Sequence, residues 1–268
     1  MITVESVEQG DLRMLHVSQV EGPKKRPSLF FFHGVSSAKE HNLHIAYTLA
    51  KKGLRVILPD ALLHGVREGD VSNETRFLSF WKVVLTSIRE LPQMVDFFVS
   101  KGLTDGEAIS VGGTSMGGIT TYGALSAYDW IDSAVSFMGA AQYEQFATNL
   151  FQRVEQAGVS ISEQSKAETL NQLASFDLSK QPEKLASRPL YVWHGKDDET
   201  VPYGFSESFV QEIAPMYAEH DGKLTFFAEE GAGHKISRAA MLDVADWLPA
   251  KLDVQSAYSG MGTQNDVH

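Results

Sequence analysis

The chain of 268 residues contains no cysteine. Disulfide bonds, thiolate nucleophiles and cysteine-ligated zinc are therefore excluded. Basic residues are also scarce, because 23 Lys and Arg stand against 34 Asp and Glu, a formal net charge of −11 at pH 7. This balance argues against nucleic acid or an anionic membrane as a partner, although it does not identify a ligand.

Long apolar runs and an N-terminal leader pattern are missing as well. No segment approaches the apolar length that a membrane-spanning helix requires. The first residues, Met1-Ile-Thr-Val-Glu-Ser6, lack a basic stretch followed by an apolar one. We therefore expect a cytoplasmic protein without a membrane partner. The small and polar segment after Leu252 is expected to be a loose end.

Hydrophobic residues make up 43% of the chain and charged residues 21%, which is ordinary for a globular protein. Strand-like runs and helical patterns alternate along nearly the whole length. Strands are predicted at 2–9, 12–20, 28–32, 54–58, from 109, at 133–138, 189–193 and 223–227. Helices are predicted at 39–52, 74–101 with a break or kink near Pro92, 115–128, 204–218 and 236–248. This alternation predicts a single α/β domain over residues 1–268, with a mostly parallel sheet covered on both faces.

The most informative stretch is Gly113-Thr-Ser-Met-Gly117, which matches the G-x-S-x-G pattern of a nucleophile elbow. A serine that must stand clear of a sheet needs a very sharp turn between a strand and a helix. Such a turn brings neighbouring backbone close, so the positions two before and two after the serine favour glycine. Ser115 is therefore a candidate nucleophile. A glycine-rich turn that happens to hold a serine is the alternative.

A serine nucleophile needs a histidine base and a carboxylate that orients the histidine. His194-Gly-Lys-Asp-Asp198 follows one predicted strand, and Gly231-Ala-Gly-His234 follows the next. The order is therefore Ser115, then Asp197 or Asp198, then His234. This is the chain order of the α/β-hydrolase fold.

At this point the sequence resembles the α/β-hydrolase superfamily. It is most similar to small bacterial serine carboxylesterases of the prolyl-oligopeptidase-like and dienelactone-hydrolase-like branch. In the family pattern H-G-x-x-D-x-x-V-P the acid is the fifth residue, and the resemblance therefore implies Asp198, with Val201 and Pro202 in the expected places. Spacing alone leaves Asp197 open.

An oxyanion is met by two backbone amides aimed at the developing charge. The residue after the nucleophile, Met116, is expected to supply one, at the start of a helix. The resemblance implies Val35 for the other, because it follows His33-Gly34 on an early loop. A second family pattern, Asp-x-x-x-His-Gly-x-Arg, fits Asp60, His64, Gly65 and Arg67. We interpret His64 and Arg67 as residues that hold that loop.

Residues 141–187 interrupt the alternation of strands and helices. Two helical patterns without a strand predict a small inserted helical cap, although a long crossover is the alternative. Ser165-Lys-Ala-Glu168 fits a capping box for the second helix. Phe146, Leu150 and Phe151 share a helix face in the first, and we expect them to form an apolar substrate-binding wall.

The leading hypothesis is a serine carboxylesterase with a small-molecule ester as its substrate and without a metal or organic cofactor. A peptidase or amidase of the prolyl-oligopeptidase-like type is the second hypothesis. A binding protein that kept the fold but lost turnover is the third. The acyl-chain preference and the oligomeric state do not follow from the sequence.

Overall fold

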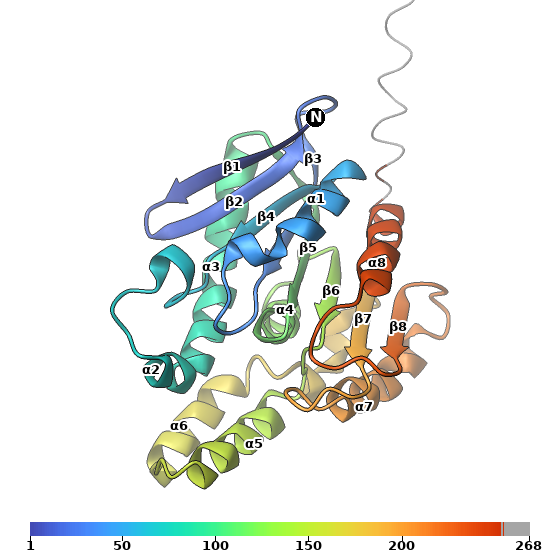
Figure 1. Ribbon diagram of the computed structural model, residues 1–268. Helices are drawn as coiled ribbons and strands as arrows, with labels where there is room; N and C mark the ends of the chain where they lie inside the picture. Colours follow the sequence, from blue (N-terminus) through green and yellow to red (C-terminus); the bar gives the residue numbers. More distant parts are fainter. Residues whose placement is uncertain (253, 255–268) are drawn as a thin grey trace, which may run out of the picture.

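The computed structural model describes residues 1–252 and 254 (Figure 1). The segment after Leu252, predicted to be a loose end, lies outside the described residues except for Val254. In the described part, eight strands form one sheet in the order β1-β2-β4-β3-β5-β6-β7-β8. The strands are β1 (Ile2–Gln9), β2 (Leu12–Gln19), β3 (Arg26–Phe32), β4 (Arg55–Pro59), β5 (Thr104–Thr114), β6 (Ser133–Phe137), β7 (Leu190–Gly195) and β8 (Leu224–Glu229).

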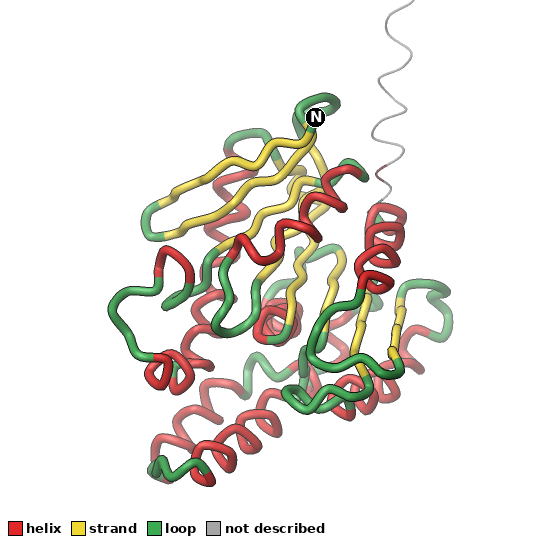
Figure 2. The backbone as a smooth tube through the Cα atoms, in the orientation of Figure 1, coloured by secondary structure: helices red, strands yellow, loops and turns green. Residues whose placement is uncertain are grey.

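The sheet is mostly parallel. Strands β1 and β2 form an antiparallel hairpin, β2 pairs antiparallel with β4, and every pair from β4 to β8 is parallel. Helices cover both faces, as Figure 2 shows with the strands in yellow and the helices in red. The α/β fold expected from the alternation of strands and helices is therefore confirmed.

The helices are α1 (Leu43–Lys51), α2 (Asn73–Leu78), α3 (Phe80–Ser100), α4 (Met116–Ala127), α5 (Tyr143–Gln156), α6 (Glu163–Leu173), α7 (Gly204–Ile213) and α8 (Arg238–Lys251). Short 3₁₀ turns are η1 (Lys39–Asn42), η2 (Gly65–Arg67), η3 (Leu178–Lys180), η4 (Pro182–Leu185) and η5 (Ala214–Tyr217). The helices predicted from residue 39 and from residue 204 therefore exist, and each includes a 3₁₀ turn at one end.

Strand β3 shows how the two hydrophobic cores form. Its side chains alternate between the faces, so Leu29 and Phe31 pack with α1 and α8, whereas Phe30 and Phe32 pack with α3 and α4. All four are buried. A strand buried on both faces reads as a continuous apolar run, which is the pattern that the sequence has here.

The sequence predicted a break or a kink near Pro92, and the break is wrong. The chain breaks at Ser79, between α2 and α3, and α3 continues through Pro92. A proline inside a helix leaves the carbonyl four residues earlier without its N–H donor. Here that carbonyl belongs to Ile88, and the Tyr128 hydroxyl donates to it at 3.1 Å. A residue outside the helix thus satisfies the carbonyl group that Pro92 leaves free.

The capping box predicted at Ser165 was also wrong. Helix α6 begins at Glu163, and its N-cap is Ser162, whose hydroxyl accepts from the Ser165 amide at 3.1 Å. The Glu168 carboxylate accepts from the Gln164 side chain instead of reaching back to the helix start. Helices α5 and α6 lie beyond the carboxyl ends of the central strands, the end of the sheet at which ligand-binding loops gather (Figure 1).

Candidate active site

Ser115 occupies the sharp turn between β5 and α4. Its backbone has φ 55 and ψ −114, a region that residues with a side chain rarely adopt. Its amide donates to the Phe137 carbonyl at 2.9 Å, and its carbonyl accepts from the Ile119 amide at 2.9 Å. Neighbouring backbone therefore holds the strained serine in place.

The two glycines of the pattern are needed because backbone passes very close to them. A Cβ atom on Gly113 would lie 2.5 Å from the carbonyl carbon of Gly117. A Cβ atom on Gly117 would lie 2.1 Å from the Phe32 carbonyl oxygen. Neither neighbour is a flexible side-chain end, so any larger residue would displace β3 or α4.

Ser115, His234 and Asp198 form a continuous chain of hydrogen bonds. His234 Nε2 lies 2.8 Å from Ser115 Oγ, and His234 Nδ1 lies 2.6 Å from Asp198 Oδ2. Asp198 belongs to the loop after β7, and His234 to the loop between β8 and α8. The structure places buried Asp198 against His234, whereas Asp197 is exposed and its amide donates to the Ala232 carbonyl.

The environment of Asp198 favours its ionised form. Burial alone would raise the pKa of this carboxyl, but hydrogen bonds from His194 and His234 outweigh burial and hold the pKa well below its usual range. The amides of Thr200 and Val201 also donate to Oδ1, at 2.9 and 3.0 Å. A carboxylate that stays charged can orient His234 and stabilise its protonated form.

His194 has a role that sequence reasoning missed. It is fully buried, and its Nε2 donates to the Val201 carbonyl at 2.8 Å while lying 3.2 Å from Asp198 Oδ2. The Ser206 hydroxyl lies 2.7 Å from its Nδ1. The signal for His194 in the sequence is the H-G-x-x-D pattern, which this histidine opens.

The loop that carries Val35 lies directly beside Ser115, since a Cβ atom on Gly34 would be 3.5 Å from the Ser115 Cβ. His33 holds this loop. Its Nε2 accepts from the Ala61 amide at 3.0 Å, so the proton must be on Nδ1, which donates to the Gly34 carbonyl at 2.7 Å. Burial lowers the pKa of His33 to about 4, so the ring stays neutral near pH 7.

Met116 lies at the first position of α4. The N–H groups of a first helical turn have no acceptor within their own helix. The Met116 amide therefore has no acceptor within α4, and the positive end of the helix dipole favours an anion beside Ser115.

The second family pattern forms a clamp behind this loop. Buried Asp60 accepts from the backbone and the ammonium of Lys39, at 2.9 and 2.6 Å, and from the Val66 amide at 3.1 Å. A Cβ atom on Gly65 would lie 2.1 Å from the Asp60 carboxylate, which explains the glycine. Arg67 donates to both carboxylate oxygens of Glu90 and to the Asp60 carbonyl.

His64 belongs to the same clamp. Its Nδ1 lies 2.8 Å from the Leu62 carbonyl, and its ring centroid lies 5.2 Å from that of His33. These contacts agree with our interpretation that His64 and Arg67 hold the loop.

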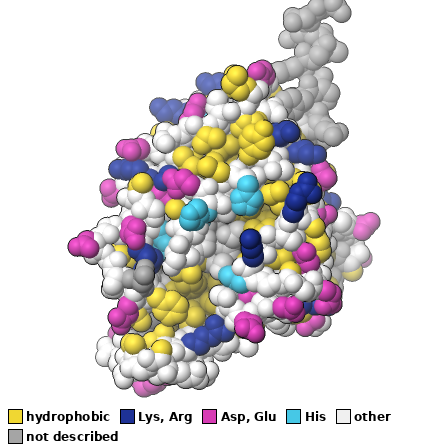
Figure 3. Space-filling view, in the orientation of Figure 1, with side chains coloured by type: hydrophobic (Ala, Val, Ile, Leu, Met, Phe, Trp, Pro, Cys, Tyr) yellow, Lys and Arg dark blue, Asp and Glu magenta, His cyan; other side chains and the backbone are white. Residues whose placement is uncertain are grey.

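A cavity of about 330 Å³ opens over Ser115. Figure 3 shows the hollow in the middle of this face. The cavity is lined by Gly34, Val35, Ser37, His44, Thr114, Ser115, Met138, Thr200, His234, Lys235 and Ile236. The space is large enough for a small ester and is open to solvent.

The three residues expected to form an apolar wall do not line this cavity. Phe146 is buried in the core, where its ring centroid lies 5.5 Å from that of Phe205 and 6.1 Å from that of Phe80. Leu150 and Phe151 are half-buried against the same core. Their shared helix face packs toward α3 and α7. The spacing predicted that the three residues share a face, but it did not predict that this face meets the core.

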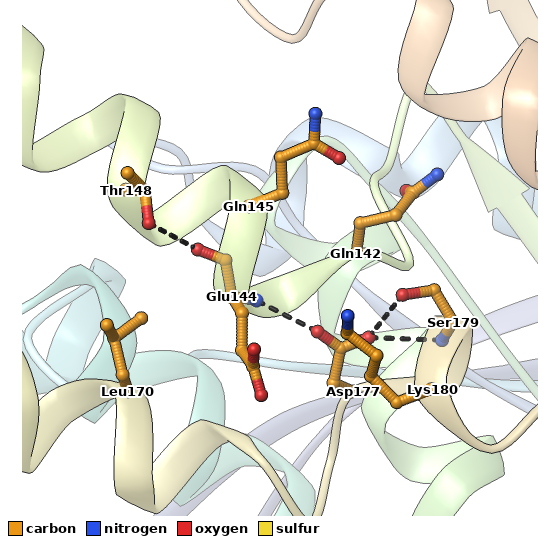
Figure 4. A pocket seen from close by; sticks show the side chains of 8 residues that line it. All are labelled: Gln142, Glu144, Gln145, Thr148, Leu170, Asp177, Ser179 and Lys180. Atoms are coloured by element: carbon orange, nitrogen blue, oxygen red, sulfur yellow. Dashed lines mark hydrogen bonds between the residues drawn. The ribbon is translucent and has the colours of Figure 1, made fainter.

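A second hollow, of about 310 Å³, lies where α5 approaches α6 and η3 (Figure 4). Fully buried Asp177 accepts from the Glu144 amide at 2.9 Å, and from the amide and hydroxyl of Ser179 at 3.1 and 2.6 Å. Over the residues that the structure describes, the acceptor contacts of this carboxylate tie the start of α5 to η3. They join the two ends of the segment 141–187 to each other.

In the part of the chain that the structure describes, no group of three or more His, Asp or Glu side chains is placed to hold a metal ion. Over the same residues, no helix combines the length and the apolar character that a membrane crossing would need.

The model of the prolyl oligopeptidase family matches residues 64–254. YitV of Bacillus subtilis, which is provisionally named an esterase, is 42% identical over 255 residues that cover 94% of this chain and 100% of the relative. The esterase YjfP of Escherichia coli is 31% identical over 246 residues, which cover 90% of this chain and 96% of the relative. The crystal structure of TT1662 from Thermus thermophilus superposes with a TM-score of 0.73 at 21% identity, covering 94% of this chain and 99% of that one.

Proposed function

The chain belongs to the prolyl oligopeptidase family, with an α/β-hydrolase fold, and from this premise we propose that it is a serine carboxylesterase. The observation that carries the proposal is the hydrogen-bonded chain from Ser115 through His234 to Asp198. Two relatives of nearly the same length, named as esterases, support the choice of an ester as substrate.

The reaction begins when Ser115 Oγ attacks the ester carbonyl carbon and its proton passes to His234 Nε2. Asp198 stabilises the imidazolium that forms. The amides of Val35 and Met116 hold the negative oxygen of the tetrahedral intermediate. The carbon–oxygen bond to the alcohol then breaks, and His234 gives its proton to the departing alkoxide.

Water completes the cycle. It attacks the acyl carbon while His234 takes its proton, and the bond to Ser115 Oγ breaks as that oxygen regains a proton. The products are one carboxylic acid and one alcohol. No step calls for a metal ion or an organic cofactor.

A peptidase or amidase is the second candidate, because the family model is that of prolyl oligopeptidases. A peptidase that grips a free amine at its substrate's N-terminus needs carboxylates near the nucleophile. Among the described residues that line the cavity over Ser115, none is Asp or Glu. This lining favours an ester whose recognition does not depend on an amine.

The test is turnover of 4-nitrophenyl acetate by the purified protein and by Ser115→Ala, beside turnover of an aminoacyl 4-nitroanilide. We expect ester hydrolysis by the wild type, at least 100-fold faster than anilide hydrolysis, and its loss in Ser115→Ala with the fold unchanged by circular dichroism. Substantial ester hydrolysis by Ser115→Ala would contradict the proposal. Faster anilide hydrolysis would favour the peptidase.

A further inference from the structure

The cavity over Ser115 differs in charge from the rest of the molecule. The whole chain has a formal net charge of −11, yet the lining of this cavity includes Lys235 and His44 beside His234, and none of its described lining residues is acidic. Ser37 and Thr200 add hydroxyl groups. In Figure 3, histidine side chains and a basic side chain border the hollow. The site therefore presents donors and positive charge in an otherwise acidic protein.

The carboxylates nearest to Lys235 along the chain are engaged elsewhere. Glu229 accepts from the Trp193 indole at 2.7 Å and from the Ser237 hydroxyl at 2.6 Å. Glu230 pairs with Lys196. Asp198, which contacts the neighbouring residue His234, is bound to that histidine. Over the residues that the structure describes, the Lys235 ammonium has no ion-pair partner within the protein. Its charge is thus available to a ligand.

Lys235 directly follows His234 in the chain, so its position is coupled to that of the base. His44 comes from the first turn of α1, beside the loop that carries Val35. Both line the cavity that holds Ser115. An anionic group on a substrate bound at Ser115 would face one or both of these side chains.

We propose that the preferred substrates are esters that carry a carboxylate close to the scissile bond, with Lys235 as the residue that determines this specificity. The inference rests on the proposed esterase function and names its substrate class. The carboxylate takes no part in bond breaking. Its ion pair with Lys235 offsets the repulsion that the net negative charge of the protein exerts on an anion.

The experiment compares charged esters with neutral esters of similar shape. Mono-4-nitrophenyl glutarate against 4-nitrophenyl valerate places the charge on the acyl side. 4-Acetoxybenzoate against its methyl ester places the charge on the leaving-group side. For each ester, kcat/KM of the wild type is divided by kcat/KM of Lys235→Met. The quotient for a pair is this ratio for the charged ester divided by the ratio for the neutral ester, so differences in intrinsic reactivity cancel.

For at least one pair we expect this quotient to be about fivefold, the scale of a partly exposed ion pair. Lys235→Arg should keep the preference, and Lys235→Glu should reverse it. Raising the NaCl concentration from 0.05 to about 0.5 M should weaken the preference of the wild type, because salt screens exposed charges. Lys82→Met, which removes the same charge from an exposed position on α3, is the matched control and should give a quotient near one.

Quotients within twofold of one for both pairs would overturn the substrate inference and leave the esterase proposal standing. An equal effect of Lys82→Met would overturn it too, since net charge and not the site would then be responsible. Absence of wild-type turnover on all four esters would overturn both proposals.

Discussion

The hydrogen bonds of His33 position the loop that carries Val35. Its Nδ1–H donates to the Gly34 carbonyl at 2.7 Å, and that carbonyl belongs to the same peptide unit as the Val35 amide. In a trans peptide the C=O and N–H groups point in opposite directions. By holding the oxygen, His33 aims the Val35 amide away from itself, and Val35 lies in the lining of the cavity over Ser115.

Two substitutions at this position separate its two hydrogen bonds. Asparagine places an amide N–H near the position of Nδ1, so His33→Asn should keep kcat within about fivefold of wild type. Glutamine reaches the position of Nε2 but loses the Gly34 contact, so His33→Gln should lower kcat by about 100-fold, the scale of a lost oxyanion donor, with KM changed less than about threefold. Steady-state kinetics on 4-nitrophenyl acetate measures both.

Equal losses in the two variants would show that His33 acts only through general packing. Circular dichroism and the midpoint of thermal unfolding serve as controls that both variants are folded.

At the scale of single elements, α3 shows how a long helix accommodates an internal proline. The Ile88 carbonyl, which Pro92 leaves without a helical donor, accepts from the Tyr128 hydroxyl at 3.1 Å. Because the ring of Tyr128 also stacks on Trp130, with centroids 5.0 Å apart, phenylalanine would keep the stacking and lose only the hydrogen bond.

Tyr128→Phe should therefore lower the free energy of unfolding by about 1 to 2 kcal/mol, the cost of leaving the carbonyl of buried Ile88 without a partner. In a Pro92→Ala background the alanine N–H can bond Ile88, so the same substitution should cost about half as much. Urea unfolding of the four proteins measures this cycle. The same cost in both backgrounds would mean that the Tyr128 hydroxyl does not replace the helical donor.

Much of the fold and of the candidate site follows from local sequence signals. The elbow glycines were readable because the close approach of backbone depends on spacing within five residues. His234 and an acid at 197 or 198 were predicted because each lies just after a strand of a parallel sheet, and the resemblance to the family pattern favoured Asp198. The continuation of α3 past Pro92 was not, because Tyr128 lies 40 residues from its acceptor Ile88.

The neighbours of α5, the first helix of the predicted cap, could not be predicted for a related reason. The spacing of Phe146 and Leu150 indicates that they share a face, but not whether this face meets the cavity or the core. His194 was overlooked because its contact with Asp198 depends on how the loop after β7 turns back.

At the scale of the whole molecule, buried neutral histidines link stability to pH. Burial lowers the pKa of His33 from 6.5 to about 4. Burial, together with the Arg55 guanidinium, lowers the pKa of His16 to about 4 as well, although Glu5 opposes this shift. In the unfolded chain both residues return to ordinary values. Between pH 6.5 and 4 the unfolded state therefore binds protons that the folded state does not.

The free energy of unfolding therefore decreases as the pH falls from 7 toward 4. For one histidine shifted from 6.5 to about 4, the loss between pH 7 and pH 5 is about 2 kcal/mol. The unfolding free energy of His33→Asn should therefore fall by about 2 kcal/mol less than that of wild type over this interval, as measured by urea unfolding at both pH values. His220→Asn, at an exposed position, is the control and should behave as wild type. Parallel curves for His33→Asn and wild type would contradict a buried neutral His33.

The central claim is that Ser115, activated by His234, is the nucleophile. The most direct measurement is labelling with a fluorophosphonate, followed by peptide mapping of the modified protein. We expect one adduct on the peptide that contains Ser115, no adduct in Ser115→Ala, and labelling of His234→Ala at least 100-fold slower than wild type. An adduct on another residue, or ester hydrolysis by a protein in which Ser115 stays unlabelled, would contradict it.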